Sequence, residues 1–245
     1  MRGLFVTGTD TGVGKTIVTA GLAGALRAEG LDAGIAKPVQ SGHAVDDPEG
    51  DTMRLVTLSG LDERPDRVNL YSLKAPLAPL VAARMEGVRI EAGPVVEHVR
   101  RAASGRDAIL VEGAGGFLVP LAPDWTVADL AAALDLPVLI VARPGLGTVN
   151  HTLLTVIAVR RAGLQVAGVV LNGWDTGTDA SRYSNAALVE EFARVRVLGQ
   201  IPRLSGLLTP GRLRAMINNH VDLEPLRRCM TPPRFQAPAA GGTIR

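Results

Sequence analysis

Apolar residues along the chain occur in short runs, and most of these runs are followed by a stretch with helical spacing. Residues 4–6 form the first apolar run, and residues 17–27 then carry apolar side chains at intervals of three and four. The same pair of patterns recurs toward the C-terminus. It predicts strands at residues 31–37, 68–73, 108–112, 136–142, 166–171 and 197–201, and helices at residues 51–58, 79–84, 91–103, 150–162 and 181–194.

The alternation of strands and helices predicts an α/β fold of the doubly wound type, with a mostly parallel sheet flanked by helices. Residues 108–111 are continuously apolar, as is typical of a parallel strand that is buried on both faces. A chain of 245 residues is long enough for one large domain with a full core. We expect residues 1–230 to form that domain, and residues 231–245, which are rich in proline and glycine, to be a disordered tail.

A glycine-rich loop with the sequence TGTDTGVGKT spans residues 7–16, between the first predicted strand and the first predicted helix. Glycines let backbone N–H groups turn toward one point, and the start of a helix adds about half a positive charge there. In such a loop Lys15 would reach the terminal phosphates of a nucleotide, and the Thr16 hydroxyl would bind Mg²⁺. The spacing departs slightly from the Walker A pattern, because Thr9 stands where its first glycine belongs. Strand, loop and helix together predict a P-loop NTPase-like fold that binds nucleotide phosphates.

Polar residues end three further predicted strands. Lys37 ends the second strand, and Ser41 follows it within the segment KPVQSG. Glu112 closes the apolar run 108–111 in the position of a Walker B-like acid, and Asn172 follows a later strand. Ligands bind at the carboxyl ends of parallel strands, so we expect these side chains to converge on the phosphate loop. The simpler alternatives are that Glu112 is a solvated strand end and that Asn172 belongs to an ordinary turn.

Composition and charge narrow the classes of function. Apolar residues make up 47% of the chain and aromatic residues only 3%, so the core must be built from aliphatic side chains. The 26 basic and 24 acidic residues leave a net charge of +2, and this balance does not favour a nucleic-acid partner. The single cysteine, Cys229, excludes an internal disulfide and suits a reducing cytoplasm. No apolar run approaches the roughly 18 to 20 residues of a membrane span, and no signal peptide precedes the first strand. We therefore expect a cytoplasmic protein without a membrane or nucleic-acid partner.

Lysine is scarce in this sequence. Only three of the 26 basic residues are lysines, and Lys15 and Lys37 lie in segments with candidate phosphate or substrate contacts. An ammonium group is a compact point charge that fits between phosphate oxygens, whereas a guanidinium group is a wide planar fork. The two lysines are therefore candidates for positions at which arginine would not serve.

Four segments, taken together, resemble the dethiobiotin synthetase family. They are the glycine-rich loop at 7–16, KPVQSG at 37–42, VEGAGG at 111–116 and GLGTVNH at 145–151. The resemblance extends over roughly residues 3–205, with the segments in the same order. It implies an ATP- and Mg²⁺-dependent ligase that closes the ureido ring of dethiobiotin from 7,8-diaminopelargonic acid and CO₂ or bicarbonate. The diamine would pass through a carbamate and a carbamic-phosphoric mixed anhydride, with release of ADP and phosphate.

The resemblance also implies roles for individual residues. Lys15 and Lys37 would be catalytic, and Thr16, Asp51 and Glu112 would bind Mg²⁺. The residues implied to bind ATP are Gly12, Val13, Gly14, Lys15, Thr16, Ile17, Asp51, Glu112, Gly113, Ala114, Gly115, Asn172, Gly173, Pro202, Arg203, Leu204 and Ser205. The residues implied to bind substrate are Thr11 and Ser41, joined across a homodimer interface by Gly147, Thr148, Asn150 and Tyr183 of the partner subunit.

Some of these residues have simpler explanations that the sequence leaves open. Lys37 could be an exposed lysine at the end of a strand. Asp51 and Asn150 could each do no more than cap the helix that follows. Asp46 and Asp47 lie in the same loop as Asp51 and compete with it as the metal ligand. The preference for ATP over CTP or GTP is also open.

Two other P-loop classes compete with the ligase interpretation. A partition or cell-division ATPase would carry a second lysine near the start of the phosphate loop, where this chain has Asp10. A cobyrinic-acid-type amide synthetase would need ammonia from a glutaminase domain, and the residues after 205 are too few to form one. Both classes are therefore less consistent with the sequence than the ligase.

Overall fold

Six of the seven predicted strands assemble into one sheet in the computed structural model, which describes residues 1–175 and 179–230. Its strand order is β10-β9-β8-β1-β5-β2, and each neighbouring pair is parallel. The predicted tail at 231–245 lies outside the described residues. The strands of this sheet are β1 (Gly3–Gly8), β2 (Ala33–Ala36), β5 (Ala108–Gly116), β8 (Val138–Ala142), β9 (Val166–Trp174) and β10 (Val197–Pro202).

The sheet is buried on both faces, which explains its continuous apolar runs. Along β1, Phe5 packs into one hydrophobic cluster, whereas Leu4 and Val6 pack into a second cluster on the opposite face. β1 lies inside the sheet between β5 and β8. The loop that leaves its carboxyl end therefore stands where the strand order reverses, the usual position of a ligand in such sheets.

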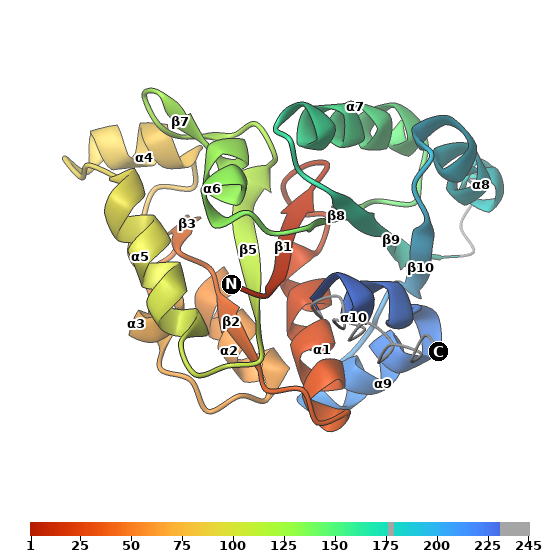
Figure 1. The fold of residues 1–245 in the computed structure, drawn as a ribbon, viewed down its shortest axis with the longest axis horizontal. Coiled ribbons are helices and arrows are strands. Elements are labelled where there is room, and N and C mark those ends of the chain that lie inside the picture. Colours follow the sequence, from red (N-terminus) through yellow and green to blue (C-terminus); the bar gives the residue numbers. More distant parts are fainter. Residues whose placement is uncertain (176–178, 231–245) are drawn as a thin grey trace, which may run out of the picture.

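Helices cover the two faces in separate layers (Figure 1). α7 and α8 pack on β8 to β10 from one side. From the other side, α9 and α10 pack on β10 and β9, and α1 packs on β1, β2 and β5. The first layer consists of α5 (Ala92–Ala103), α6 (Val127–Leu134), α7 (Thr148–Arg161) and α8 (Arg182–Ala193). The second consists of α1 (Lys15–Ala28), α2 (Asp51–Ser59), α9 (Pro210–His220) and α10 (Glu224–Met230). The doubly wound fold predicted from the sequence is confirmed.

Several short elements differ from the sequence prediction or had none. The strand predicted at 68–73 is shorter, because residues Pro65–Val68 form the helix α3. Its remainder, β4 (Tyr71–Leu73), pairs with β3 (Val39–Ser41) in a separate two-stranded sheet. No prediction covered the hairpin of β6 (Pro120–Ala122) and β7 (Trp125–Thr126), or the helices α6, α9 and α10. The helix predicted at 79–84 is present as α4 (Pro79–Met85).

Within residues 1–175 and 179–230, none of the helices combines the length and the apolar character that a bilayer crossing requires.

Candidate functional site

The phosphate loop leaves β1 and enters α1 through Gly14. Gly14 has φ of 91°, in the left-handed region, and a Cβ at this position would overlap the side-chain amide of Asn172. Lys15 is the first residue of α1, is buried, and donates a hydrogen bond from Nζ to the carbonyl oxygen of Asp10 at 3.2 Å. The lysine thus folds back across its own loop, as it must to lie beside phosphates bound there.

Two carboxylates and a lysine form a compact cluster beside this loop. Lys37 Nζ lies 2.5 Å from Glu112 Oε1 and 2.8 Å from Asp51 Oδ2. The Thr16 hydroxyl lies 2.8 Å from Glu112 Oε1 and 3.2 Å from Asp51 Oδ1. Residues far apart in the sequence, on α1, after β2, on α2 and on β5, therefore meet at one point.

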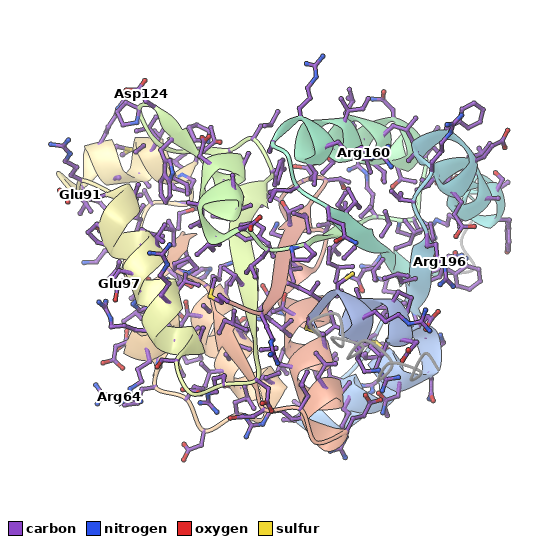
Figure 2. All side chains as sticks on the ribbon, viewed as in Figure 1. Arg64, Glu91, Glu97, Asp124, Arg160 and Arg196 are labelled. Carbon is purple, nitrogen blue, oxygen red and sulfur yellow. The ribbon has the colours of Figure 1, made fainter. Side chains whose placement is uncertain are left out.

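Lys37 and Glu112 differ from most other charged groups of the described residues in their burial, whereas the Asp51 side chain of the same cluster is 47% exposed. Lys37 is 2% exposed and Glu112 is 0% exposed. Charged side chains such as Arg64 and Arg196 instead extend from the periphery, where they are 72% and 68% exposed (Figure 2). Buried charges are costly unless they are paired, so a fold that retains them invites a functional explanation. The two simpler alternatives, a surface lysine at 37 and a solvated acid at 112, are wrong.

Glu112 reaches the cluster from within a strand, which corrects the prediction that it closes one. β5 continues past it to Gly116, and the pairing between β1 and β5 shifts register between Val6 and Gly8. Lys37 in turn is held by its backbone just after β2. Its N–H donates to the carbonyl oxygen of Val68, and Asn69 Nδ2 donates to the Lys37 carbonyl at 2.8 Å.

The charges in the cluster shift one another's pKa values. Burial raises the pKa of Glu112, and the nearby Asp51 carboxylate raises it further against the opposing effect of Lys37. Burial works against the charged form of Lys37, but Glu112 and Asp51 outweigh it and raise the Lys37 pKa. Burial also works against ionisation of Asp51, yet Lys37 keeps the Asp51 pKa below its ordinary value. Lys37 is therefore a permanent cation near neutral pH.

Lys15 behaves differently from Lys37. Burial, together with the repulsion from the Lys37 ammonium, lowers the pKa of Lys15 to about 8. The protein's carboxylates therefore stabilise the Lys15 ammonium less than they stabilise the Lys37 ammonium. A negatively charged ligand would supply the missing compensation.

The chemistry of the cluster suits Mg²⁺. Glu112 Oε2 is buried and has no hydrogen-bond partner among the described residues, so one carboxylate oxygen is left for a ligand. Within that part of the chain, no group of three or more His, Cys, Asp or Glu side chains is placed to enclose a metal ion. Mg²⁺ needs no such cage, because it is usually held by one or two carboxylates and completed by water and phosphate oxygens. Thr16, Asp51 and Glu112 provide such a set of oxygens.

Asp46 and Asp47, the alternatives to Asp51 as the metal ligand, lie away from the cluster. Asp47 accepts hydrogen bonds from the Glu49 N–H at 3.0 Å and lies 3.0 Å from the His43 ring. Neither Asp46 nor Asp47 lines the cavity at the cluster, whereas Asp51 does. Asp51 is also the first residue of α2. The geometry therefore favours Asp51 over its neighbours as the metal ligand.

A cavity of about 790 Å³ opens over the cluster. It is large enough for a nucleotide tail together with a small substrate. One wall is apolar and is built from residues 76–79 and Val119. The predicted site residues that line the cavity are Thr11, Gly12, Gly14, Lys15, Thr16, Ile17, Lys37, Ser41, Asp51, Glu112, Ala114 and Gly115.

Several residues predicted to bind ATP lie outside this cavity. β9 continues to Trp174, past the strand end predicted at residue 171, so Asn172 lies within the strand, and its Nδ2 donates to the Val13 carbonyl at 2.9 Å. Arg203 N–H donates to the Trp174 carbonyl at 2.7 Å, so the ends of β9 and β10 stay together beyond the sheet. Asn172 thus ties the end of β9 to the phosphate loop. The other members of this group are Gly113 on β5, Gly173 on β9, Pro202 on β10, and Leu204 and Ser205 just after it.

The residues predicted to act across a dimer interface also lie outside the cavity. Gly147 precedes α7 as its N-cap, Thr148 is its first residue, and Asn150 is exposed within its first turn. Tyr183 is 69% exposed and contacts Trp174 edge to face, with ring centroids 6.0 Å apart. These residues do not line the cavity of their own chain.

Two polar residues of the cavity wall had no predicted role. Gln40 Oε1 accepts hydrogen bonds from the Thr52 N–H at 2.8 Å and the Thr52 hydroxyl at 2.6 Å, and thereby fixes the first turn of α2. Its Nε2 donates to the Ala44 carbonyl at 3.1 Å and to the Ser72 hydroxyl at 2.7 Å. Arg54 lies on α2, one turn after Asp51. Gln40 stands inside the KPVQSG segment, but only the fold reveals what it holds.

Replacing Gln40 by alanine should weaken Mg²⁺-dependent nucleotide binding and lower the stability by about 1–2 kcal/mol, because Asp51 would lose the fixed helix start that positions it. The measurements are ATP binding titrated with Mg²⁺ and thermal melting. Gln165→Ala removes an exposed glutamine and serves as the control. A Mg²⁺ dependence identical to that of the unmodified chain would contradict the positioning role.

Nucleotide affinity should be nearly constant below about pH 8 and should fall as the pH rises further. Phosphates favour the ammonium form, so binding raises the Lys15 pKa from its free value of about 8, and above that pH the protein must take up a proton to bind. Calorimetry in two buffers of different ionisation enthalpy measures this uptake. Binding without proton uptake at about pH 9 would contradict the prediction.

Comparison with known proteins gives consistent results. A family model described as an AAA domain matches residues 2–210. The chain is 53% identical over 202 residues to the ATP-dependent dethiobiotin synthetase BioD of Anaeromyxobacter dehalogenans, covering 82% of this chain and 90% of the relative. It is 42% identical over 223 residues to the protein of the same name from Bacillus licheniformis, covering 91% and 94% respectively.

Solved structures support the fold. A chain of the MinC:MinD cell division protein complex of Aquifex aeolicus superposes with a TM-score of 0.54 at 15% identity, covering 89% of this chain and 88% of that chain. The cell division ATPase MinD of Pyrococcus furiosus superposes with a TM-score of 0.51 at 21% identity, covering 83% and 84%. At such low identity the likeness concerns the fold alone. The high identity and coverage of the curated relatives decide the family: this chain belongs to the ATP-dependent dethiobiotin synthetases and is an ATP-dependent ligase of biotin biosynthesis.

Proposed function

We propose that this chain closes the ureido ring of dethiobiotin from 7,8-diaminopelargonic acid and CO₂, with consumption of ATP in the presence of Mg²⁺. The observation that carries the proposal is the buried Lys37 ammonium, held 2.5 Å from Glu112 beside Lys15 in one cavity. One amine of the diamine attacks CO₂ and loses a proton to give a carbamate. A carbamate oxygen then takes the γ-phosphoryl group from ATP, and ADP leaves. The second amine attacks the carbonyl carbon, and phosphate is expelled.

This sequence of steps needs no nucleophilic side chain from the protein. It needs positive charge where the carbamate and the transferring phosphoryl group lie. Lys15 stabilises the terminal phosphates, and Lys37 stabilises the carbamate oxygen and the charge that develops during transfer. Because Lys37 is already positioned by Glu112 and Asp51, little reorganisation is needed when the substrates arrive.

Thr16, Asp51 and Glu112 are the residues we propose to hold Mg²⁺, which would offset the negative charge of the phosphate groups. The Thr16 hydroxyl lies within hydrogen-bond distance of both carboxylates, and the free Glu112 Oε2 would add a further ligand atom.

The remaining ligand contacts follow from the walls of the cavity. Thr11 and Ser41 are proposed to bind the diamine or its carbamate. The Ser41 hydroxyl at present donates to the Leu77 carbonyl at 2.7 Å, so it also holds the apolar wall against which the aliphatic chain would pack. Asn172 and residues 202–205 are proposed to bind the base, since they gather at the strand ends next to the phosphate loop.

We further propose that residues 1–230 act as one domain in a cytoplasmic homodimer. The far carboxylate of the substrate would be bound by Gly147, Thr148 and Asn150 at the start of α7 of the partner subunit, with Tyr183. The start of a helix presents N–H groups to an anion. Leu146, just before α7, and Leu154 and Ile157 on it are 80%, 57% and 49% exposed, and dimer formation would cover these apolar side chains.

The decisive experiment is an assay of ADP release by the purified protein with diaminopelargonate, bicarbonate, ATP and Mg²⁺, and with each component omitted in turn. The expected result is release that depends on all four. Hydrolysis of ATP at the same rate without the diamine would reject the ligase reaction and favour a switch ATPase of the MinD type. Mass spectrometry of the product identifies the closed ring.

A further inference from the structure

Arg54 lies in the wall of the candidate active site but has no role in the proposed reaction so far. It is located on α2, one helical turn after Asp51, and its side chain is half-buried. Together with Lys15 and Lys37 it is one of three cations that line the cavity within the described residues. A long side chain on a helix leans toward the helix N-terminus, which here is the end that carries Asp51.

The guanidinium group of Arg54 makes no hydrogen bond or ion pair to another described residue. Its nearest acid in the sequence is already engaged, because Asp51 Oδ1 lies against the Thr16 hydroxyl and Asp51 Oδ2 against Lys37 Nζ. Other half-buried arginines of this chain are paired. Arg106, for example, contacts both Asp32 and Glu63. A partly desolvated guanidinium without a partner is unfavourable unless a ligand supplies one.

The charge balance of the cavity also indicates that Arg54 binds an anionic ligand. Lys37 is neutralised within the protein by Glu112 and Asp51, so it leaves little positive charge in excess. A triphosphate keeps a net negative charge even after Mg²⁺ binds, and the carbamate adds another. Lys15 and Arg54 are the lining cations without a carboxylate partner among the described residues. Arg54 therefore provides charge that the ligands need and that the sequence motifs do not account for.

We propose that Arg54 binds the phosphate chain of the nucleotide, through the two N–H donors of its planar fork. The proposal rests on the proposed function and assigns it a further ligand-binding residue. Phosphate is preferred to the substrate carboxylate because Arg54 lies on α2, one turn after the proposed metal ligand Asp51, and α2 packs against α1, which carries Thr16. The apolar wall at 76–79 is built by a different segment, after β4. A guanidinium fork matches two phosphate oxygens in a way that an ammonium does not.

The test compares Arg54→Gln, Arg54→Lys and Arg100→Gln with the unmodified protein. Arg100 is an exposed arginine on α5 outside the cavity, and its replacement removes the same charge. Calorimetry measures the affinity for ATP with Mg²⁺, and steady-state kinetics measures KM for the diamine and kcat. Circular dichroism and melting temperature establish that each variant is folded.

Arg54→Gln should weaken Mg²⁺-ATP binding about ten-fold or more, Arg54→Lys should weaken it less, and neither should change KM for the diamine. Arg100→Gln should bind ATP like the unmodified chain. Unchanged ATP affinity in folded Arg54→Gln overturns the proposal, and so does a rise in KM for the diamine alone, which would move Arg54 to the substrate. Nucleotide affinity is measured without turnover. A failure of the ligase assay in the unmodified protein is thus distinguishable from a failure of this assignment.

Discussion

Lys37→Ala should reduce kcat about a thousand-fold while leaving ATP affinity within a few-fold of its original value. The Lys37 ammonium is bound to Glu112 and Asp51 in the absence of ligands, so it adds little to ground-state nucleotide binding. Its charge counts most when negative charge develops on the carbamate and the transferring phosphoryl group. The measurements are diamine-dependent ADP release for kcat and calorimetry for ATP affinity.

The matched control for this variant is Lys74→Ala, because Lys74 is an exposed lysine outside the cavity. It should leave both quantities unchanged. Lys37→Ala should also lower the free energy of unfolding by about 3 kcal/mol or more, since it leaves Glu112 buried without its closest countercharge. Equal losses of ATP affinity and kcat would show that Lys37 acts in binding and would contradict the assignment.

Glu112→Gln should remove most of the benefit that Mg²⁺ brings to nucleotide binding. The substitution keeps the size of the side chain but eliminates its charge, and it can place an N–H₂ group where Oε2 now lies free. We expect Mg²⁺-ATP affinity to fall about ten- to a hundred-fold and kcat to fall by at least as much. Binding of ATP in the presence of a chelator should change little, and calorimetry over a range of Mg²⁺ concentrations separates the two effects.

Two controls make this result specific to the cluster. Asp46→Asn changes an exposed acid in the neighbouring loop and should preserve the Mg²⁺ dependence. Asp51→Asn should share the phenotype of Glu112→Gln, because both carboxylates contact the Thr16 hydroxyl. A loss of Mg²⁺ dependence in Asp46→Asn, with none in Asp51→Asn, would overturn the proposed ligand set.

The sheet and the phosphate loop could be predicted because both are encoded locally. A continuous apolar run followed by helical spacing identifies a buried parallel strand and its crossover helix, and the glycines of 7–16 identify the turn between them. The prediction of a strand at 68–73 is only partly correct. Pro65 starts the short helix α3, which includes Val68, and the remaining strand β4 lies in a separate sheet. The hairpin of β6 and β7 has too few residues to display a period.

Some residues of the cavity could likewise be predicted from the sequence, and others could not. Lys37 follows β2 directly and Glu112 follows an apolar run within β5, both in recognisable segments, and so they could be proposed from the sequence. Gln40 and Arg54 could not be assigned. Gln40 acts through Thr52, twelve residues away on another element. Arg54 resembles any other polar residue on an amphipathic helix until the direction of α2 is known.

By itself, the sequence determined the strands of the main sheet, the phosphate loop and the family, since these depend on neighbouring residues and on motifs read in order. Only the tertiary structure decided that Lys37 and Glu112 are buried and in contact, and that Asp51 rather than its neighbours joins them. It also left Arg54 in the cavity wall without a partner among the described residues. The physical reason is that pairing, burial and pKa depend on distances between segments that are far apart along the chain, and the packing of α1 and α2 against each other and beside the sheet sets those distances.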